Sequence, residues 1–270
     1  MTGPRETGPR ETGLRETGLR ETGPREGQVI EAFVSLSRTL VTGYDVVDLL
    51  DGLTGDCARL LDVASAGLLL ADGRGVLHVL AASSQRTRDL EVFQLQRGDG
   101  PCLDCYSGGE PVSSADLERE TGRWPQFVPA ARAAGFASAH ALPLRLGDIT
   151  SGALGLFGTS VGALNAEDLA LGQALADVAS VALVQDKAAA DRSSVAEQLQ
   201  SVLVARVALE QAKGVLAQKG GLDTAQALTV LRRYAGEHHQ RLSDVARAVV
   251  TRTLPAQQLL ANSGTPQRQL

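Results

Sequence analysis

The stretch that most constrains the fold is Leu199–Val250, where apolar residues recur at helical spacing in three separate blocks. The first block stops at Gly220-Gly221, because glycine tolerates the positive φ that often follows a helix C-terminus. The second begins after Asp223-Thr224, either of which can cap free N–H groups. The third is expected to begin after Ser243 and must end before Pro255. Because three such short helices bury little surface, we expect them to pack on a partner chain or on a longer first helix.

The charge of this stretch is opposite to that of the rest of the chain. The whole sequence has a net charge of −5. Residues 195–254 contain eight basic and five acidic residues, whereas residues 27–194 contain twelve basic and 21 acidic residues. A phosphate backbone would be attracted by the first segment and repelled by the second. Since basic faces are also common on helices that bind nothing, the charge alone fits a solvated helix face equally well.

Specific motifs occupy all three expected helices of the C-terminal segment. They are Ala205-Arg206 and LEQAKGVL at 209–216, then Ala227 with Leu231-Arg232-Arg233, then RLSDVA at 241–246. The combination closely resembles the ANTAR domain, a bacterial RNA-binding module of transcription antitermination. Two positions depart from the family pattern. Ala217 stands where methionine is frequent, and His239 stands where asparagine is common.

The resemblance implies that the C-terminal unit binds paired short RNA hairpins and prevents a terminator from forming. In such complexes lysine and arginine side chains hold the phosphates, while loop bases are read by stacking and polar contacts. Gly214 would allow RNA and backbone to approach closely. The residues expected to contact phosphate are Arg206, Lys213, Arg232, Arg233 and Arg241. A DNA-binding transcriptional regulator that uses the same basic helices is the alternative for this surface.

Upstream of this unit, the apolar spacing predicts alternating helices and hairpins. Helices are expected near residues 28–40, 45–61, 86–95 and 124–134. The turn sequence Asp72-Gly73-Arg74-Gly75 predicts a first hairpin, and residues 138–146 and 151–159 are candidates for a second one. Glycines at 152, 155 and 158 indicate a close approach of backbone or ligand. This order predicts an α+β fold with helices on the sides of a sheet.

A second resemblance covers residues 99–183. It is carried by GPCLD at 100–104, GEPV at 109–112, Trp124-Pro125, LPL at 142–144, GALGL at 152–156 and Asp168-Leu169. These motifs resemble the GAF domain, which implies a regulatory pocket for a small-molecule ligand, a cofactor or a redox signal. They do not identify which ligand or cofactor that is. The fold expected for the whole chain is therefore a GAF-type antiparallel sheet flanked by helices, a long connecting helix and a small three-helix ANTAR bundle.

The expected domain organisation follows from these boundaries. Residues 1–27 contain five tandem TGPRE or TGLRE pentapeptides, which bury almost nothing apolar and are expected to be disordered. They are interpreted as a passive tail, or alternatively as a tether or nucleic-acid-binding arm. The remaining units are a GAF sensor domain at 28–185, a helical linker at 186–196, an ANTAR domain at 197–254 and a disordered tail at 255–270.

The segment 165–219 contains no proline and could form almost one continuous helix. Its apolar residues follow a heptad seam, which predicts a homodimer through the connecting helix. These residues are Val195, Leu199, Val202, Leu209 and Leu216. Arg206 and Lys213 occupy positions where further apolar residues would be expected. Either the two cations extend outward along their apolar stems, or the pairing loosens there so that they meet RNA.

The pair Cys102 and Cys105 forms a lone C-x-x-C motif. It is interpreted as structural, with a thiol redox sensor as the first alternative. Some GAF-fold enzymes reduce free methionine sulfoxide, so a reductase that uses these cysteines, with Cys57, is the second alternative. A zinc site would need two further ligands at suitable spacing, and the sequence offers no second pair. We therefore expect neither a metal site nor an enzyme.

The sequence also bears on location. The odd number of cysteines, three, argues against a disulfide framework and fits a reducing compartment. No apolar run approaches the roughly 20 residues of a membrane helix, and the N-terminus lacks the hydrophobic region of a secretory signal. The expected location is the cytoplasm, without membrane contact.

Overall fold

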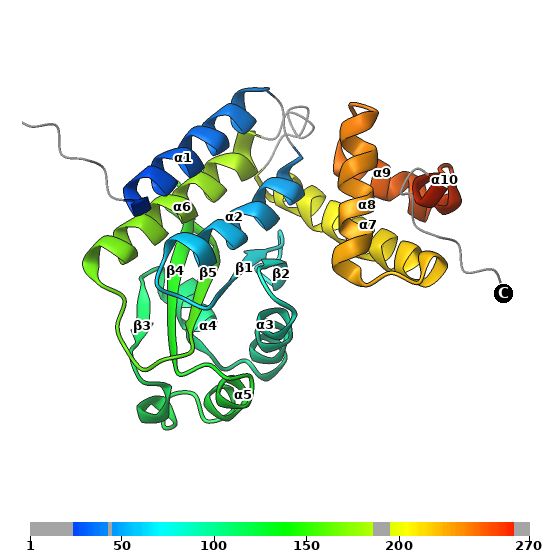
Figure 1. Ribbon diagram of the computed structural model, residues 1–270. Coiled ribbons are helices and arrows are strands. Elements are labelled where there is room, and N and C mark those ends of the chain that lie inside the picture. Colours follow the sequence, from blue (N-terminus) through cyan, green and yellow to red (C-terminus); the bar gives the residue numbers. More distant parts are fainter. Residues whose placement is uncertain (1–23, 43–44, 186–194, 262–270) are drawn as a thin grey trace, which may run out of the picture.

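The computed structural model describes residues 24–42, 45–185 and 195–261. The described residues form an N-terminal domain (24–185) and a C-terminal bundle (195–261) that lies beside it (Figure 1). Most of the pentapeptide repeats and most of the predicted linker lie outside the described residues.

The N-terminal domain is built on one five-stranded sheet in which every neighbouring pair is antiparallel. Its order is β2-β1-β5-β4-β3. The strands are β1 (Ser65–Ala71), β2 (Leu77–Ala82), β3 (Val112–Ser114), β4 (Ser138–Leu146) and β5 (Ile149–Gly158). Both predicted hairpins are present, as β1–β2 and β4–β5, and the predicted α+β fold class is confirmed.

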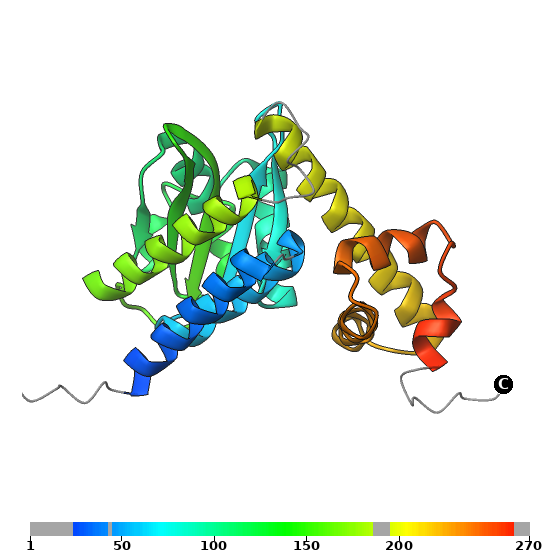
Figure 2. The ribbon, with the colours of Figure 1, turned by 90° about the horizontal axis from the view of Figure 1, so that it is seen from above.

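Helices cover both faces of this sheet (Figures 1 and 2). One face carries α1 (Pro24–Thr42), α2 (Val46–Leu60) and α6 (Ala166–Gln185). The other carries α3 (Gln85–Arg97), α4 (Pro101–Gly108), α5 (Phe127–Ala133) and the short 3₁₀ helix η1 (Leu117–Glu120). Successive strand residues point to opposite faces, so Leu68 and Leu70 join the core under α2 and α6, while Leu69 joins the core under α3 and α4.

The C-terminal bundle consists of α7 (Val195–Gly220), α8 (Thr224–Glu237), α9 (Leu242–Val250) and α10 (Ala256–Ala261). Gly221 ends the first helix with φ +62°, and Asp223 caps α8 in a capping box with Gln226. Helix α9 begins at Leu242, earlier than the start expected after Ser243, because the extended backbone of Arg241 forms its N-cap.

Helix α10 lies inside the segment 255–270 that the sequence predicts as a disordered tail. Its side chains Ala256 and Leu259 are buried in the same apolar cluster as the bundle, which holds this short helix in place. At the other end of the chain, α1 begins at Pro24, within the last pentapeptide repeat, where proline suits the first turn of a helix.

The long segment expected to be almost one helix is described as two helices, α6 and α7, that run in different directions (Figures 1 and 2). Four residues of the predicted dimer seam, Leu199, Val202, Leu209 and Leu216, are buried within this chain. The seam therefore packs on the chain's own bundle and on the N-terminal domain.

Among the described helices, none has the length and apolar character that crossing a membrane requires.

A candidate nucleic-acid interface covered by helix α2

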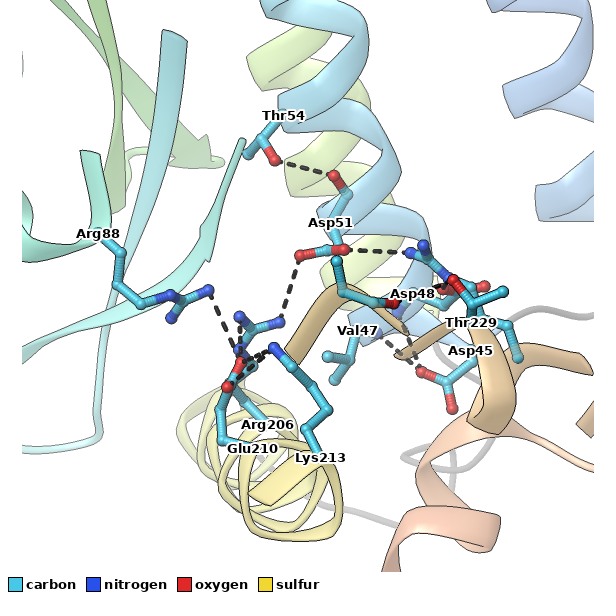
Figure 3. Close-up of polar contacts among 12 residues, drawn as sticks. Asp45, Val47, Asp48, Asp51, Thr54, Arg88, Arg206, Glu210, Lys213 and Thr229 are labelled. Carbon is cyan, nitrogen blue, oxygen red and sulfur yellow. Dashed lines mark hydrogen bonds and ion pairs between the residues drawn. The ribbon is translucent and has the colours of Figure 1, made fainter. Parts of the chain in front are cut away.

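Three of the cations expected to contact RNA lie together at the junction of the two parts of the molecule. Arg206 and Lys213 are two turns apart on α7, so they share one face of that helix, and Arg232 comes from α8. Arg206 and Arg232 contact aspartates of helix α2 in the N-terminal domain. Lys213 lies beside Arg206, and both pair with Glu210 (Figure 3). The sequence thus predicted three residues that the fold brings together, although they face an acidic helix.

The acids on α2 follow one another at intervals of three residues, as Asp45, Asp48 and Asp51. Residues at this spacing lie on neighbouring positions of one helix face, here called the α2 acidic face. Asp45 is the N-cap of the helix, and its Oδ1 accepts from the backbone N–H groups of Val47 at 3.0 Å and Asp48 at 3.2 Å. Its Oδ2 is then available to the bundle, where it accepts from Ser243 N–H at 2.6 Å.

Arg206 is the most buried cation of the group, with only 4% of its surface exposed. Its Nη1 lies 3.4 Å from Asp51 Oδ1, and its Nη2 lies 2.5 Å from Glu210 Oε1 one turn along α7. Burial lowers the pKa of the Arg206 guanidinium, and the carboxylates of Glu210 and Asp51 oppose that shift. A buried arginine of this kind is held by its acidic partners rather than by water.

Glu210 connects Arg206 to two further cations. It lies within 3.1 Å of Lys213 Nζ through both carboxylate oxygens and 3.7 Å from Arg88 on α3. Burial raises the pKa of the Glu210 carboxyl, but Arg206, Lys213 and Arg88 lower it by more, so its pKa is below the ordinary value. The side chain of Lys213 is 12% exposed. Neither Arg206 nor Lys213 therefore presents its charge freely to solvent.

Arg232 completes the junction by binding two acids of the α2 acidic face. Its Nε is 2.5 Å from Asp48 Oδ1, and its Nη2 is 3.1 Å from Asp51 Oδ2. Burial lowers the pKa of Arg232, but the two carboxylates raise it by more, so the net shift is upward. Asp51 thus bridges Arg206 and Arg232 through its two oxygens.

The other predicted RNA contacts are Gly214, Arg233 and Arg241. Gly214 is exposed on α7, and a Cβ placed there would meet nothing within 4 Å. Arg233 is 36% exposed and lies 3.8 Å from Glu237 on the same helix. Arg241 lines, with Arg232 and His239, a hollow of about 870 Å³ between α1–α2 and α8–α9. Arg241 therefore lies at the junction with Arg206, Lys213 and Arg232, whereas Gly214 and Arg233 lie elsewhere on the bundle.

Sequence reasoning missed the acidic partners of these cations. The apolar spacing that predicts a helix at 45–61 agrees with the burial of Leu50 and Leu53, but it gives no partner for the aspartates of this helix. The signal that could have found them is the spacing of the three acids, together with the opposite net charges of the two parts of the chain.

The second candidate site, Cys102 and Cys105, lies on α4 under the sheet. Both thiols are fully buried, and Cys102 Sγ donates to Glu91 Oε1 at 3.6 Å. Burial raises the pKa of Cys102 well above its ordinary value and that of Cys105 to about 12. Since the thiolate is the nucleophile of redox chemistry, the surroundings disfavour the reactive form of both residues.

Glu91 on α3 occupies the space beside these thiols. A Cβ added at Gly155 would lie 2.6 Å from Glu91 Oε1 and 2.8 Å from Cys102 Sγ, and one added at Gly67 would also lie 2.6 Å from that oxygen. Of the three glycines predicted to mark a close approach, Gly155 is approached by this carboxyl and thiol, Gly152 by the backbone of Leu69 and Gly158 by the side chain of Ser138. Burial raises the pKa of Glu91 to about 8, although hydrogen bonds from Cys102 and Gln94 act to lower it.

Within residues 24–42, 45–185 and 195–261, no three His, Cys, Asp or Glu side chains are grouped so that they could hold a metal ion.

Solved structures similar to this chain include GAF domains and a free methionine-R-sulfoxide reductase. A GAF domain of an Acinetobacter phosphoenolpyruvate-protein phosphotransferase is 12% identical, covers 60% of this chain and 97% of its own, and has a TM-score of 0.47. The free methionine-R-sulfoxide reductase of Neisseria meningitidis, solved with its substrate, is 15% identical, covers 60% and 91%, and has a TM-score of 0.47. No curated protein matches the chain.

Family models match both parts of the molecule. The GAF domain model matches residues 44–184, which contain the sheet and α2 to α6. The ANTAR domain model matches residues 197–250, which contain nearly all of α7 together with α8 and α9. The chain belongs to the GAF domain family and carries a C-terminal ANTAR domain.

Proposed function

We propose that this protein is a GAF-regulated antitermination factor that acts in the bacterial cytoplasm, and that its ANTAR domain binds hairpin RNA. The observation that carries the proposal is the convergence of Arg206, Lys213 and Arg232, from two helices of the ANTAR domain, on one face. A group of cations on rigid helices suits the phosphates of a folded transcript. Non-enzymatic regulation also agrees with the combination of a GAF and an ANTAR domain.

The ANTAR domain would combine two kinds of contact. Lys213, Arg206 and Arg232 would fix the hairpin through its phosphates, and Arg233 and Arg241 would extend that track over α8 and α9. Gly214 follows Lys213 directly on α7 and leaves open space where a side chain would stand, which supports a close approach of RNA to the backbone. Loop bases would provide the sequence selectivity.

The GAF domain would receive the signal as a small molecule. The buried thiols argue against the two alternatives that use Cys102 and Cys105, because both pKa values are raised away from the reactive form. Ligand control is therefore the proposed input, and a redox sensor or a reductase is not.

A homodimer through the connecting helix is part of the proposal, since two hairpins require two ANTAR domains. The heptad seam predicted on α7 is buried against other parts of the same chain, but Val204 and Val207 on this helix are 52% and 56% exposed. These two valines, three residues apart on one face, support pairing through the outward side of α7.

The test is the RNA affinity of Lys213→Ala. We expect weaker binding to an RNA of two short stem-loops, and a salt slope of log K reduced by about 1, because one phosphate contact is lost. Arg206→Ala should act in the same direction. The matched control is Arg119→Ala, which removes one exposed cation from η1 of the GAF domain. Equal affinity of wild type and Lys213→Ala, with helix content unchanged by circular dichroism, would refute the assignment, and preference for duplex DNA in competition would favour a DNA-binding regulator.

A further inference from the structure

Two of the cations assigned to RNA, Arg206 and Arg232, are already bound to carboxylates of the GAF domain in this structure. Each member of the α2 acidic face has a partner in the ANTAR domain: Asp45 accepts from Ser243 N–H, Asp48 binds Arg232, and Asp51 binds both Arg206 and Arg232. We propose that the α2 acidic face is a built-in competitor of RNA that masks the ANTAR domain until the GAF domain withdraws it. This inference rests on the proposed RNA-binding function.

Occupancy of the site by α2 and by RNA is mutually exclusive on geometric grounds. Arg206 is 4% exposed and one of its nitrogens faces Asp51, so a phosphate cannot reach this charge while α2 is in place. Both oxygens of Asp51 point to guanidinium groups, as the oxygens of a phosphate would (Figure 3). A phosphate can therefore take the place of Asp51 at Arg206 and Arg232 only after the ANTAR domain has separated from α2.

One part of the contact is exposed and loosely packed. The Arg232–Asp48 pair is about 40% exposed on both sides, and pairs this exposed contribute little to stability. Beside it, the hollow of about 870 Å³ leaves part of the junction unpacked. Among the described residues, Arg206 Nε is buried without a hydrogen-bond partner, which a contact selected for stability alone would avoid. The Arg232–Asp48 pair and the hollow are therefore the part of the junction that opens most readily, whereas the buried Arg206–Asp51 pair holds the mask in place.

The same helix links the mask to the sensor. Leu50 and Leu53 of α2 are fully buried in the core that covers the sheet, whereas Asp48 and Asp51 lie on the side that meets the ANTAR domain. Any ligand that binds better when α2 is displaced would shift the population toward the open state. Such a ligand would raise the RNA affinity by the same factor by which bound RNA raises the affinity for the ligand.

The test uses the full chain and removes the mask without touching any RNA-binding residue. Asp48→Asn/Asp51→Asn abolishes two charges of the α2 acidic face, and Asp56→Asn/Asp62→Asn abolishes two charges at the other end of the same helix. Asp56 lines the edge of the hollow but pairs with Arg59 within α2, and Asp62 is exposed just beyond the helix, so this control corrects for the general loss of repulsion of RNA. Apparent affinities are measured by fluorescence anisotropy with a labelled pool of paired stem-loops whose loops are randomised.

We expect the Asp48→Asn/Asp51→Asn protein to bind about tenfold more tightly than wild type, within the ~5- to 150-fold range of typical coupling, and the control to stay within about twofold. Hydrogen exchange should rise in α8 and at the Ser243 amide of the first variant alone, because these groups lose their partners on α2. RNA binding by wild type and the Asp48→Asn/Asp51→Asn protein with equal affinity would overturn the mask and leave the proposed function intact. No RNA binding by any of the proteins would overturn both.

Discussion

At the scale of single residues, the surroundings of Glu91 predict a measurable pH dependence of stability. It is fully buried, and burial raises its pKa from the ordinary 4.5 to about 8. Between these two values the unfolded chain ionises while the folded protein keeps the proton, so stability falls as the pH rises. The loss is at most ~1.4 kcal/mol per pH unit, and it ends above the folded pKa.

Glu91→Gln should therefore flatten the pH dependence of unfolding. Glutamine has the same shape and no titration, so the stability of the variant relative to wild type should rise from pH 5 to pH 8, by roughly 1–3 kcal/mol after allowance for relaxation of the site. Urea unfolding of both proteins at pH 5 and pH 8 measures this difference in the free energy of unfolding. Glu118→Gln, an exposed carboxyl on η1, is the control. A constant difference between Glu91→Gln and wild type at both pH values would show that Glu91 is ionised in the folded protein.

Gly214 is the residue where fold and function make opposite predictions. A glycine inside an exposed stretch of helix costs about 0.5–1 kcal/mol relative to alanine, and a Cβ at this position meets nothing. Gly214→Ala should thus raise the free energy of unfolding by about that amount and, at the same time, weaken RNA binding. Gly55→Ala on α2, equally exposed and unobstructed, should give the stability gain alone. Unchanged RNA affinity in Gly214→Ala would remove this residue from the interface.

At the scale of elements, the sequence predicts what each helix buries but not what it meets. Periodicity identified both hairpins, the inward side of α2 and the blocks that became α7, α8 and α9, because one face of each is apolar. It could not pair Asp48 with Arg232, since the two are 184 residues apart and spacing within an element carries no information about its partner. Helix α10 was not predicted, for a different reason. Its six residues are too few to show a periodic pattern, and the helix is stabilised by tertiary packing of Leu259 against the bundle.

The heptad seam of α7 is a second case in which the sequence predicts a buried face but not the partner that covers it. Leu199, Val202 and Leu209 do form an apolar stripe, as the heptad pattern predicted, but the stripe packs within the chain. A single sequence gives the burial of a face and leaves open whether the partner is a second copy or another domain of the same chain. Here the bundle and the GAF domain cover it, and Arg206, in the middle of the stripe, meets Asp51 instead of solvent.

At the scale of the whole molecule, the two domains carry opposite net charge and form ion pairs with each other. RNA binding at this face is therefore an exchange of carboxylate partners for phosphates. When RNA displaces α2, phosphates replace carboxylates, and the freed acids regain counterions from solution. The ion release that drives binding to RNA is then partly offset. We expect log K to fall less steeply with log salt in wild type than in Asp48→Asn/Asp51→Asn, with a slope shallower by about 1–2. Anisotropy titrations between 50 and 300 mM KCl (an interval of about sixfold) measure both slopes, with Asp56→Asn/Asp62→Asn as the reference for charge. Parallel lines for wild type and Asp48→Asn/Asp51→Asn would mean that the α2 acidic face stays in place when RNA binds.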